Sequence, residues 1–313
     1  MKIKFVVMLM IGLLLISGCD YVKEKIGSFG GGDKEEETLA EDITGTLGLV
    51  FDFVRLPETI MPEQTFDILL DLENKGKTNI ENGILTISGY NDAYFTLYTT
   101  KKEGIDLEGV SLYTKIGEST TETFRISRTT LPSHLNEYIA NFVATACYPY
   151  QTEATPTVCI NPKLVTGGIA SKGECEETDF TLKTQGAPLT VTKVETYYST
   201  DVTFVEFKVF VENKGNGRVR AKEAYKKECV GPALTQEDLG TVKIEGYLGG
   251  RKLVCYDLNG NQDSFKLENG QGTAKCKAQI DRTKPAYTSV LNIILDYGYV
   301  DSVNKQVKMS RTI

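Results

Sequence analysis

An internal repeat of alternating apolar and polar residues constrains this chain more than any other feature. Residues 66–76 read FDILLDLENKG and residues 205–215 read VEFKVFVENKG, so both segments end at Asn-Lys-Gly. Farther on, ISGY (87–90) matches IEGY (244–247), and ANFVATACY (140–148) matches LNIILDYGY (291–299). Successive side chains on a strand point to opposite faces, so this period predicts strands buried on one side. Three matches in the same order indicate two copies of one β domain.

The repeat predicts the domain organisation. The length of 313 residues suits two domains. We predict an all-β fold with two tandem immunoglobulin-like β-sandwich domains, at 43–165 and 186–313, joined by a connector at 166–185. Seven or eight short strands in roughly 120 residues, with turn residues between them, are typical of such sandwiches.

The second copy contains an insertion. The distance from the turn glutamate to Gly-Tyr is 16 positions in the first copy (Glu73 to Gly89) and 34 in the second (Glu212 to Gly246). The extra residues include Cys229. Function often resides in such loops, because a rigid sheet holds them in place.

The lead-in to the first alternating strand carries a family resemblance. Pro57 and Pro62, the strand that follows and its Asn-Lys-Gly turn resemble the CARDB-type modules of prokaryotic surface proteins. The segment from Cys147 to Cys159 is also similar to hairpins in archaeal envelope proteins. These resemblances imply an immunoglobulin-like fold at a cell surface, but no particular function, because sandwiches have many unrelated roles.

The N-terminus predicts export and a lipid anchor. Lys2 and Lys4 precede an apolar run at 5–16, which is shorter than the roughly 20 residues that span a bilayer and suits a signal peptide at 1–18. The sequence LISGC, ending at Cys19, resembles the lipobox of prokaryotic lipoproteins. This resemblance implies cleavage before Cys19 and a diacylglyceryl group on its sulfur. An uncleaved signal anchor with an incidental cysteine is the alternative.

Residues 19–42 are predicted to form a flexible tether. The stretch after Cys19 holds Gly30-Gly31-Gly32 and eight acids against three lysines, which favours a solvated chain. A tether of this length reaches roughly 25 Å. We therefore expect the domains at the extracytoplasmic face of a membrane, with lipid as their anchor.

The remaining cysteines predict three disulfides. An even number of cysteines in an exported chain is typical of a disulfide framework. We expect Cys147 to pair with Cys159, because both are present in one copy only and on consecutive strands. Cys255 and Cys276 flank one region of the second domain and are expected to pair. Cys175 of the connector and Cys229 of the insertion remain as the third pair.

One acidic segment has the spacing of a calcium loop. Its oxygen-bearing side chains occupy positions 1, 3, 5, 7 and 12 of an EF-hand-like pattern: Asp257, Asn259, Asn261, Asp263 and Glu268. However, Gln262 stands where that pattern has glycine. A polar hairpin that turns at Asn259-Gly260 is therefore the alternative. A zinc site is not expected, since the chain lacks C-x-x-C and has one histidine.

Catalysis has few candidate residues. His134 is the single histidine, and no G-x-S-x-G sequence occurs. Ser302 to Lys305 match S-x-x-K, but in a region predicted to be β. We expect no enzymatic activity and no cofactor. The net charge of −7 argues against binding to nucleic acid.

These features predict a non-enzymatic, membrane-anchored surface protein that acts as a spacer, adhesion or protein-interaction module. Its expected partners are the membrane, through lipid, and another envelope or surface protein. The alternative is a solute- or glycan-binding lipoprotein that serves a transporter or surface hydrolase. A pocket lined by tyrosines and acids would favour this alternative.

Overall fold

The computed structural model describes residues 48–111, 113–162, 175, 179–198, 203–281 and 283–312. The predicted signal peptide, Cys19 and the tether lie outside these residues. Most of the described chain is β-strand, and its one α-helix is α3 (Tyr225–Val230). The prediction of an all-β fold built from sandwiched sheets is confirmed. Within the described residues, no helix is long and apolar enough to cross a membrane.

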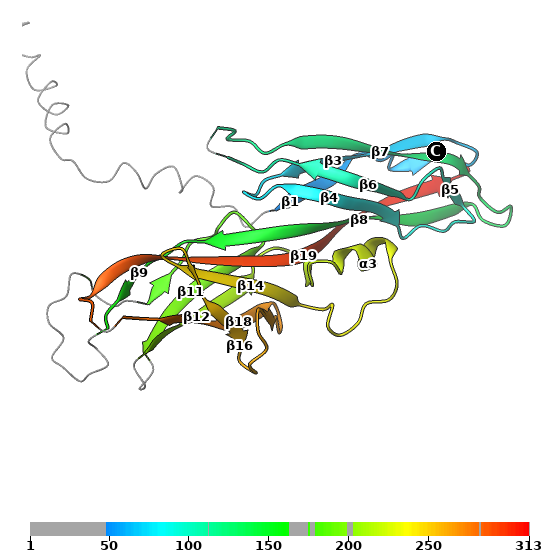
Figure 1. Ribbon diagram of the computed structural model, residues 1–313. Helices are drawn as coiled ribbons and strands as arrows, with labels where there is room; N and C mark the ends of the chain where they lie inside the picture. The colour runs from blue at the N-terminus through cyan, green and yellow to red at the C-terminus, as the bar shows by residue number, and fades with distance from the viewer. Residues whose placement is uncertain are drawn as a thin grey trace, which may run out of the picture. The chain divides into compact units, whose positions relative to one another are not determined.

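Each repeat contributes one sheet of its own (Figure 1). The first repeat forms a four-stranded sheet of order β1-β3-β7-β5. Its strands are β1 (Leu49–Arg55), β3 (Phe66–Asn74), β5 (Phe95–Leu97) and β7 (Ser119–Thr129). The second repeat forms a five-stranded sheet of order β10-β11-β12-β18-β16. Its strands are β10 (Phe180–Thr181), β11 (Leu189–Tyr198), β12 (Phe204–Asn213), β16 (Val254–Asp257) and β18 (Gln271–Gln279).

A third sheet of ten strands belongs to both repeats. Its main order is β15-β14-β19-β8-β4-β6. These strands are β4 (Ile80–Ser88), β6 (Lys101–Leu107), β8 (Glu137–Ala154), β14 (Thr241–Leu248), β15 (Arg251–Lys252) and β19 (Tyr287–Ser310). The short strands β2 (Thr59–Ile60), β9 (Thr157–Ile160) and β13 (Arg218–Arg220) pair with β19, and β17 (Ser264–Lys266) pairs with β14.

The alternating segments form strands because one set of side chains enters the core. In β3, Ile68, Leu70 and Leu72 are fully buried, as are the alternate apolar residues of β12, beginning with Val205 and Phe207. Each such side chain contributes about 1.5–3 kcal/mol when it leaves water. The intervening residues point outward, so the period of two fixes which side chains each sheet exposes.

The two Asn-Lys-Gly turns are built identically. The Asn74 side chain donates to the Thr78 carbonyl at 2.8 Å and accepts from the Gly76 amide at 3.2 Å. Asn213 makes the corresponding bonds, over the same distances, to residues 217 and 215. Asparagine favours turns because its side chain can bond nearby backbone groups in this way. The repeated motif therefore ends a strand and is structural in both copies.

The central pairing joins the two repeats. Strands β8 and β19 are antiparallel along their shared length, from Ala154 opposite Ile293 to Glu137 opposite Ser310 (Figure 1). Tyr148 and Tyr299, which match in the repeat alignment, lie directly opposite each other. A local two-fold axis through this pair therefore relates the two copies.

This arrangement differs from two tandem domains separated by a connector. Residues 43–313 form one compact unit, and apolar residues of both repeats belong to one continuous core. Pairing across repeats gives both long strands a ladder partner over their full length, so no exposed edge remains between the copies. Most of the predicted connector at 166–185 lies outside the described residues.

Candidate functional site

The predicted bond between Cys147 and Cys159 is wrong, because the chain does not reverse between them. Pro149 lies within β8, opposite Gly298, and both β8 and β9 pair with β19 in the same direction. Twelve extended residues separate the two cysteines by roughly 40 Å. A disulfide requires Cα atoms within about 7 Å. Cys159 instead pairs with Cys175.

The predicted bond between Cys175 and Cys229 is also wrong. Cys229 lies on α3, in the insertion of the second repeat, and is bonded to Cys147 on β8 of the first repeat, with a Cα–Cα distance of 6.2 Å. The helix packs over Ile84 and Val300, on the side of the shared sheet opposite the main core. The insertion thus crosses from one repeat to the other and is covalently fixed there.

The predicted bond between Cys255 and Cys276 is confirmed. The two residues lie directly opposite each other on β16 and β18, with Cα atoms 4.0 Å apart. Both side chains are fully buried. This bond fixes the edge strand of the five-stranded sheet.

The segment predicted as a calcium loop forms a polar hairpin between β16 and β17. One carboxylate oxygen of Asp257 accepts the amides of Asn259 and Asn261, each at 2.8 Å, and the other accepts the Asn261 side chain at 2.7 Å. These hydrogen bonds lower the pKa of Asp257 against the effect of its burial. Asp263 adopts a positive φ of 58°. The described residues contain no group of three or more acidic, cysteine or histidine side chains placed to hold a metal.

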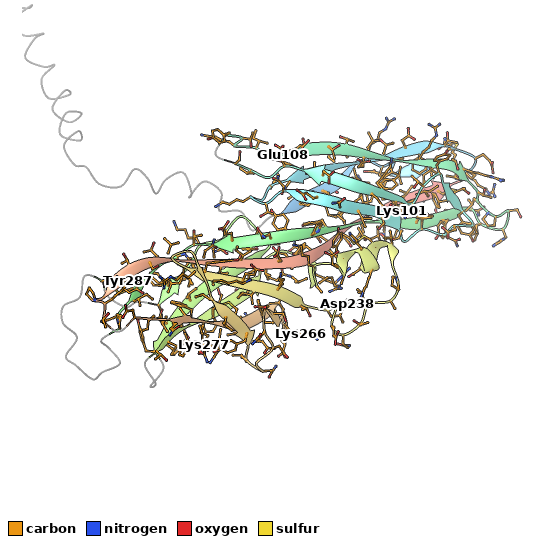
Figure 2. The ribbon with its side chains drawn as sticks, viewed as in Figure 1. Lys101, Glu108, Asp238, Lys266, Lys277 and Tyr287 are labelled. Atoms are coloured by element: carbon orange, nitrogen blue, oxygen red, sulfur yellow. A yellow bond between two sulfur atoms is a disulfide. The ribbon has the colours of Figure 1, made fainter. Side chains whose placement is uncertain are left out.

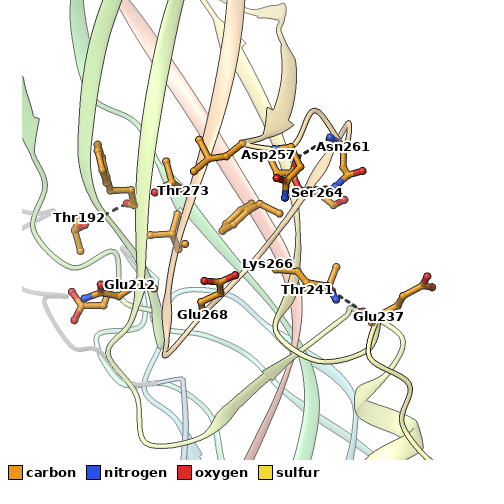
Figure 3. A pocket seen from close by; sticks show the side chains of 17 residues that line it. Thr192, Glu212, Glu237, Thr241, Asp257, Asn261, Ser264, Lys266, Glu268 and Thr273 are labelled. Carbon is orange, nitrogen blue, oxygen red and sulfur yellow. Dashed lines mark hydrogen bonds between the residues drawn. The ribbon is translucent and has the colours of Figure 1, made fainter.

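An open cleft of about 1040 Å³ lies beside this hairpin (Figure 3). Of the five calcium candidates, Asp257, Asn259, Asn261 and Glu268 line it, and Asp263 does not. The labelled polar side chains around it are Thr192, Glu212, Glu237, Thr241, Asp257, Asn261, Ser264, Lys266, Glu268 and Thr273. Four carboxylates against one lysine make this lining acidic.

The outer surface of the five-stranded sheet continues from this cleft, and we call it the basic face. Inward-pointing residues of β12 alternate with outward-pointing ones, which include Glu206, Lys208 and Phe210. The face is defined by the outward side chains of four strands: Lys193, Glu195, Tyr197, Phe204, Glu206, Lys208, Phe210, Val254, Tyr256, Lys275 and Lys277. Figure 2 shows Lys277 among the side chains of this sheet. These residues include four lysines and two glutamates, and two further acids lie at the margin of the face: Glu212, the next outward residue of β12, and Asp179, which lies 2.9 Å from Lys193.

Glu206 is the electrostatic centre of the basic face. It accepts Lys275 at 2.8 Å, lies 3.6 Å from Lys277 and accepts the Tyr256 hydroxyl. Burial alone would raise the pKa of Glu206, but the bonds from Lys275 and Tyr256 hold it below its usual range. Lys277 also lies 5.0 Å from the ring centre of Tyr256. This contact places the Lys277 ammonium over an aromatic ring.

A second carboxylate, Glu195, organises the neighbouring strand. Lys193 donates to it at 2.6 Å and so does the Tyr197 hydroxyl. The bond from Lys193 lowers the pKa of Glu195. Lys193, Lys275 and Lys277 each form an ion pair, whereas Lys208 forms none within the described residues. Its amino group lies 4.6 Å from the ring centre of Phe210. The sequence signal for this face is the alternation in β12. The residues between buried Val205 and Phe207 and their successors must point outward.

The remaining candidates for chemistry are ordinary structural residues. His134 is exposed in the connection before β8. Ser302 to Lys305 lie inside β19, where Ser302 bonds the Thr145 hydroxyl at 2.9 Å. All six described cysteines are in disulfides.

The sequence matches no protein-family model and no curated protein. Among solved structures, the chain is similar at 10% identity to the CupB6 tip adhesin of Pseudomonas aeruginosa, over 84% of this chain and 98% of that one, with a TM-score of 0.18. It is also similar at 10% identity to the collagen binding domain of the surface protein RspB of Erysipelothrix rhusiopathiae, over 86% and 95%, with a TM-score of 0.14. With TM-scores this low, neither likeness bears on the function of this chain.

Proposed function

We propose that this protein is a non-enzymatic interaction module, held outside the cytoplasm by lipid on Cys19, which binds a partner protein through the basic face. The observation that carries the proposal is the combination of unburied rings and lysines on that face. Tyr197 is 48% exposed and Phe204 is 41% exposed. Aromatic residues are enriched at protein interfaces and provide large contact areas at low cost in side-chain entropy.

The disulfide framework supports an extracytoplasmic location. Disulfides persist in oxidising compartments and are rare where thiols are kept reduced. One of them fixes the insertion across the two repeats, and another fixes the edge strand of the binding sheet. The scaffold therefore presents the basic face on a rigid support, which suits binding with little rearrangement.

Site-specific photo-crosslinking tests this proposal. A photoreactive residue replaces Tyr197 on the basic face and, as the matched control, Asn304, which is exposed on the outer side of the shared sheet. Illumination of the tethered protein in its own membranes is expected to give a discrete adduct from position 197 and none from position 304. Equal labelling from both positions, or no adduct from 197, would contradict the proposal.

A small-solute or glycan-binding role is the second candidate. It is favoured by a pocket of about 250 Å³ on the basic face, lined by Tyr197, Tyr198, Phe204, Glu206 and Lys277. Aromatic rings beside a few convergent polar groups are typical of small-molecule sites. Calorimetric titration with neutral oligosaccharides tests it. Binding that Phe204→Ala removes would support it, and the absence of heat with every oligosaccharide would exclude these ligands.

A further inference from the structure

We propose that the loop at residues 108–118, between β6 and β7, inserts its tip into the surface of the lipid bilayer in which Cys19 is expected to be anchored. Two large apolar side chains are exposed at this tip: Tyr113 is 97% exposed and Ile116 is 75% exposed. Exposed apolar side chains gathered among polar residues mark a protein or membrane contact. This contact rests on the lipid anchor of the proposed function and adds a second attachment to the same membrane.

The loop lies beside the point where the described chain begins. The Gly48 carbonyl accepts the Lys75 amide at 2.9 Å, in the Asn-Lys-Gly turn that follows β3. The same turn holds the base of the loop, because the Gly76 carbonyl accepts the Val110 amide at 2.7 Å. The loop and the chain that leads back to Cys19 therefore emerge from the same end of the four-stranded sheet.

The reach of the tether permits contact between the tip and the bilayer. Tyr113 can lie at most about 17 Å from Glu118 at the base of the loop, since an extended residue spans about 3.4 Å. The tether predicted at residues 19–42 reaches roughly 25 Å. The anchored chain can therefore bring the base of the loop close enough for its tip to enter the headgroup layer.

Hydrogen bonds hold the tip in a closed turn. The Ser111 hydroxyl accepts the Tyr113 amide at 3.3 Å and the Thr114 amide at 3.1 Å. The Ser111 amide donates to the Thr114 carbonyl at 2.9 Å. Backbone polar groups that enter a bilayer need internal partners, because the hydrocarbon offers none. The turn thus supplies partners for its own backbone while it exposes the Tyr113 ring.

The second repeat shows that the fold does not require this loop. There the corresponding connection, between β17 and β18, is the short turn at residues 267–270. Asn213 donates its amide to the Gly270 carbonyl at 2.7 Å. Asn74 makes the equivalent bond to Glu118 in the first repeat, at 3.0 Å. The exposed residues of the short turn are both polar. The longer loop with apolar tip residues therefore belongs only to the repeat that follows the tether.

Charge does not drive the contact. The loop and the adjacent turn at residues 73–79 together carry three lysines and three glutamates: Lys75, Lys77, Lys115, Glu73, Glu108 and Glu118. A balanced set suits a layer of zwitterionic lipid headgroups, where tyrosine rings are favoured. Lys115 can place its methylene stem with the apolar tip and its amino group at the level of the phosphates. Two apolar side chains bind a bilayer weakly, so the contact depends on the effective concentration that the anchor provides.

Tyr98 is a matched control at the other end of the same strand. It is 86% exposed and precedes β6, whereas the loop follows β6. Lys101 and Glu108 mark the two ends of this strand in Figure 2. The seven residues of β6 span about 23 Å, so only Tyr113 is close to the start of the described chain.

Photolabelling from lipid tests the contact. The full lipidated chain is reconstituted in phosphatidylcholine vesicles that contain a lipid with a diazirine near the glycerol end of one acyl chain. Labelled tryptic peptides are then identified by mass. The peptide that ends at Lys115 contains Tyr113, and it is expected to carry about tenfold more label than the peptide that ends at Lys101 and contains Tyr98. The ratio should persist in about 0.5 M salt, because an apolar contact is not screened.

Variants connect the label to the two apolar side chains. Tyr113→Ser combined with Ile116→Ser should lower the labelling of the Lys115 peptide about tenfold, whereas Tyr98→Ser should leave it unchanged. The replaced side chains are exposed, so the melting temperature should not change in either variant. Equal label on the two wild-type peptides would overturn the proposal. So would loop label that persists after both apolar side chains are removed.

The same vesicles separate this contact from the proposed function. Label on tether peptides without label on the loop peptide would support the anchor and overturn the loop contact. A loop that binds a protein instead of lipid would give this second result, because the vesicles contain no other protein. An adduct between position 197 and a different protein would then leave the proposed function standing. A chain that does not float with the vesicles would contradict both the anchor and the loop contact.

Discussion

Tyr148 and Tyr299 face each other across the ladder between β8 and β19, and the Tyr299 hydroxyl accepts the Gly217 amide at 2.9 Å. With Tyr150 and Tyr297 they form a buried group of four rings, whose neighbouring centroids are 5.8–6.3 Å apart. Burial raises the pKa of each of these hydroxyls, so all four are neutral at physiological pH. The junction between the repeats is therefore a packed core rather than a hinge.

The four tyrosines differ in their hydrogen bonds, which gives a matched pair of variants. Tyr299 also donates to the Asn213 side chain at 3.1 Å. Tyr299→Phe would leave these buried groups unpaired and is expected to lower the free energy of unfolding by about 1–3 kcal/mol. The Tyr150 hydroxyl is buried without a hydrogen-bond partner in the described residues. Tyr150→Phe should therefore change stability by less than about 0.5 kcal/mol, or increase it.

Urea unfolding of both variants and the wild type measures this difference. The two substitutions remove the same atom from the same ring cluster, so each serves as the control for the other. Equal losses of stability would show that the two hydroxyls are equally well bonded.

The sequence predicted the strands and much of their register. The match of ISGY with IEGY and of ANFVATACY with LNIILDYGY is reproduced in the ladders: Ile87 pairs with Ala144, and Ile244 with Leu295. Alternation was sufficient to predict these strands and their register because one set of alternate side chains must be buried in the core. Tyr148, Tyr150 and Tyr299, which lie inside the two long strands, are buried in that core.

The sharing of one sheet by both repeats could not be predicted in the same way. The alternation of residues in β8 determines which face of the strand is buried. It does not determine which strands form hydrogen bonds with its two edges. The predictions of Cys147–Cys159 and Cys175–Cys229 failed for this reason. They assumed that each repeat closes on itself, whereas Cys229 reaches Cys147 through contacts between segments 82 residues apart.

The disulfides make a quantitative prediction. In the chain-entropy model, the 82-residue separation of Cys147 and Cys229 contributes about 4.5 kcal/mol, and the 16-residue separation of Cys159 and Cys175 about 3 kcal/mol. Replacing both cysteines of the first pair by alanine should therefore cost more stability than replacing both of the second. Peptide mapping without reduction should identify a peptide that joins Cys147 to Cys229. A peptide that joins Cys147 to Cys159 would contradict this connectivity.

Asp257 distinguishes a turn from a calcium site. Its carboxylate accepts three hydrogen bonds within the hairpin, so Asp257→Ala should lower the melting temperature by the same amount with and without millimolar Ca²⁺. A ligand that binds only the folded state raises its stability, so a calcium site would give the wild type an additional rise. Thermal unfolding in Ca²⁺, in Mg²⁺ and in chelator measures this. A rise specific to Ca²⁺ that the variant loses would establish the metal site.

The lipid anchor is tested through Cys19. The mature chain is expected to begin at Cys19, to carry a diacylglyceryl group and to partition into detergent. Cys19→Ser should block both lipidation and cleavage, because a thioether cannot form on a hydroxyl. The intact mass of the membrane-extracted protein decides between the outcomes. An unlipidated mass corresponding to residues 1–313 would refute the anchor.

The hydrogen bonds of Asp238, in the segment after α3, predict that the stability of the folded protein depends on pH. Its carboxylate accepts Lys227 at 2.9 Å, and also the Thr235 amide at 2.7 Å and hydroxyl at 2.9 Å. The bond from Lys227, followed by that from the Thr235 amide, lowers the pKa of Asp238 to about 2. The carboxylate is thus more acidic in the folded chain than in the unfolded one, where its pKa is about 3.9. Its contribution to stability is therefore fully present above about pH 4 and is lost as the pH falls towards 2.

Denaturant unfolding between pH 6 and pH 2 measures this contribution as the difference between wild type and Asp238→Asn. Other carboxylates titrate over the same range, but they affect both proteins and cancel in the difference. The wild type should be more stable above pH 4, and the difference should shrink steadily towards pH 2. Glu237→Gln, at the adjacent position, removes one carboxylate that lacks these bonds and is the control for the loss of a negative charge alone. A constant difference for Asp238→Asn across the range would mean that its bonds with Lys227 and Thr235 do not depend on the charge.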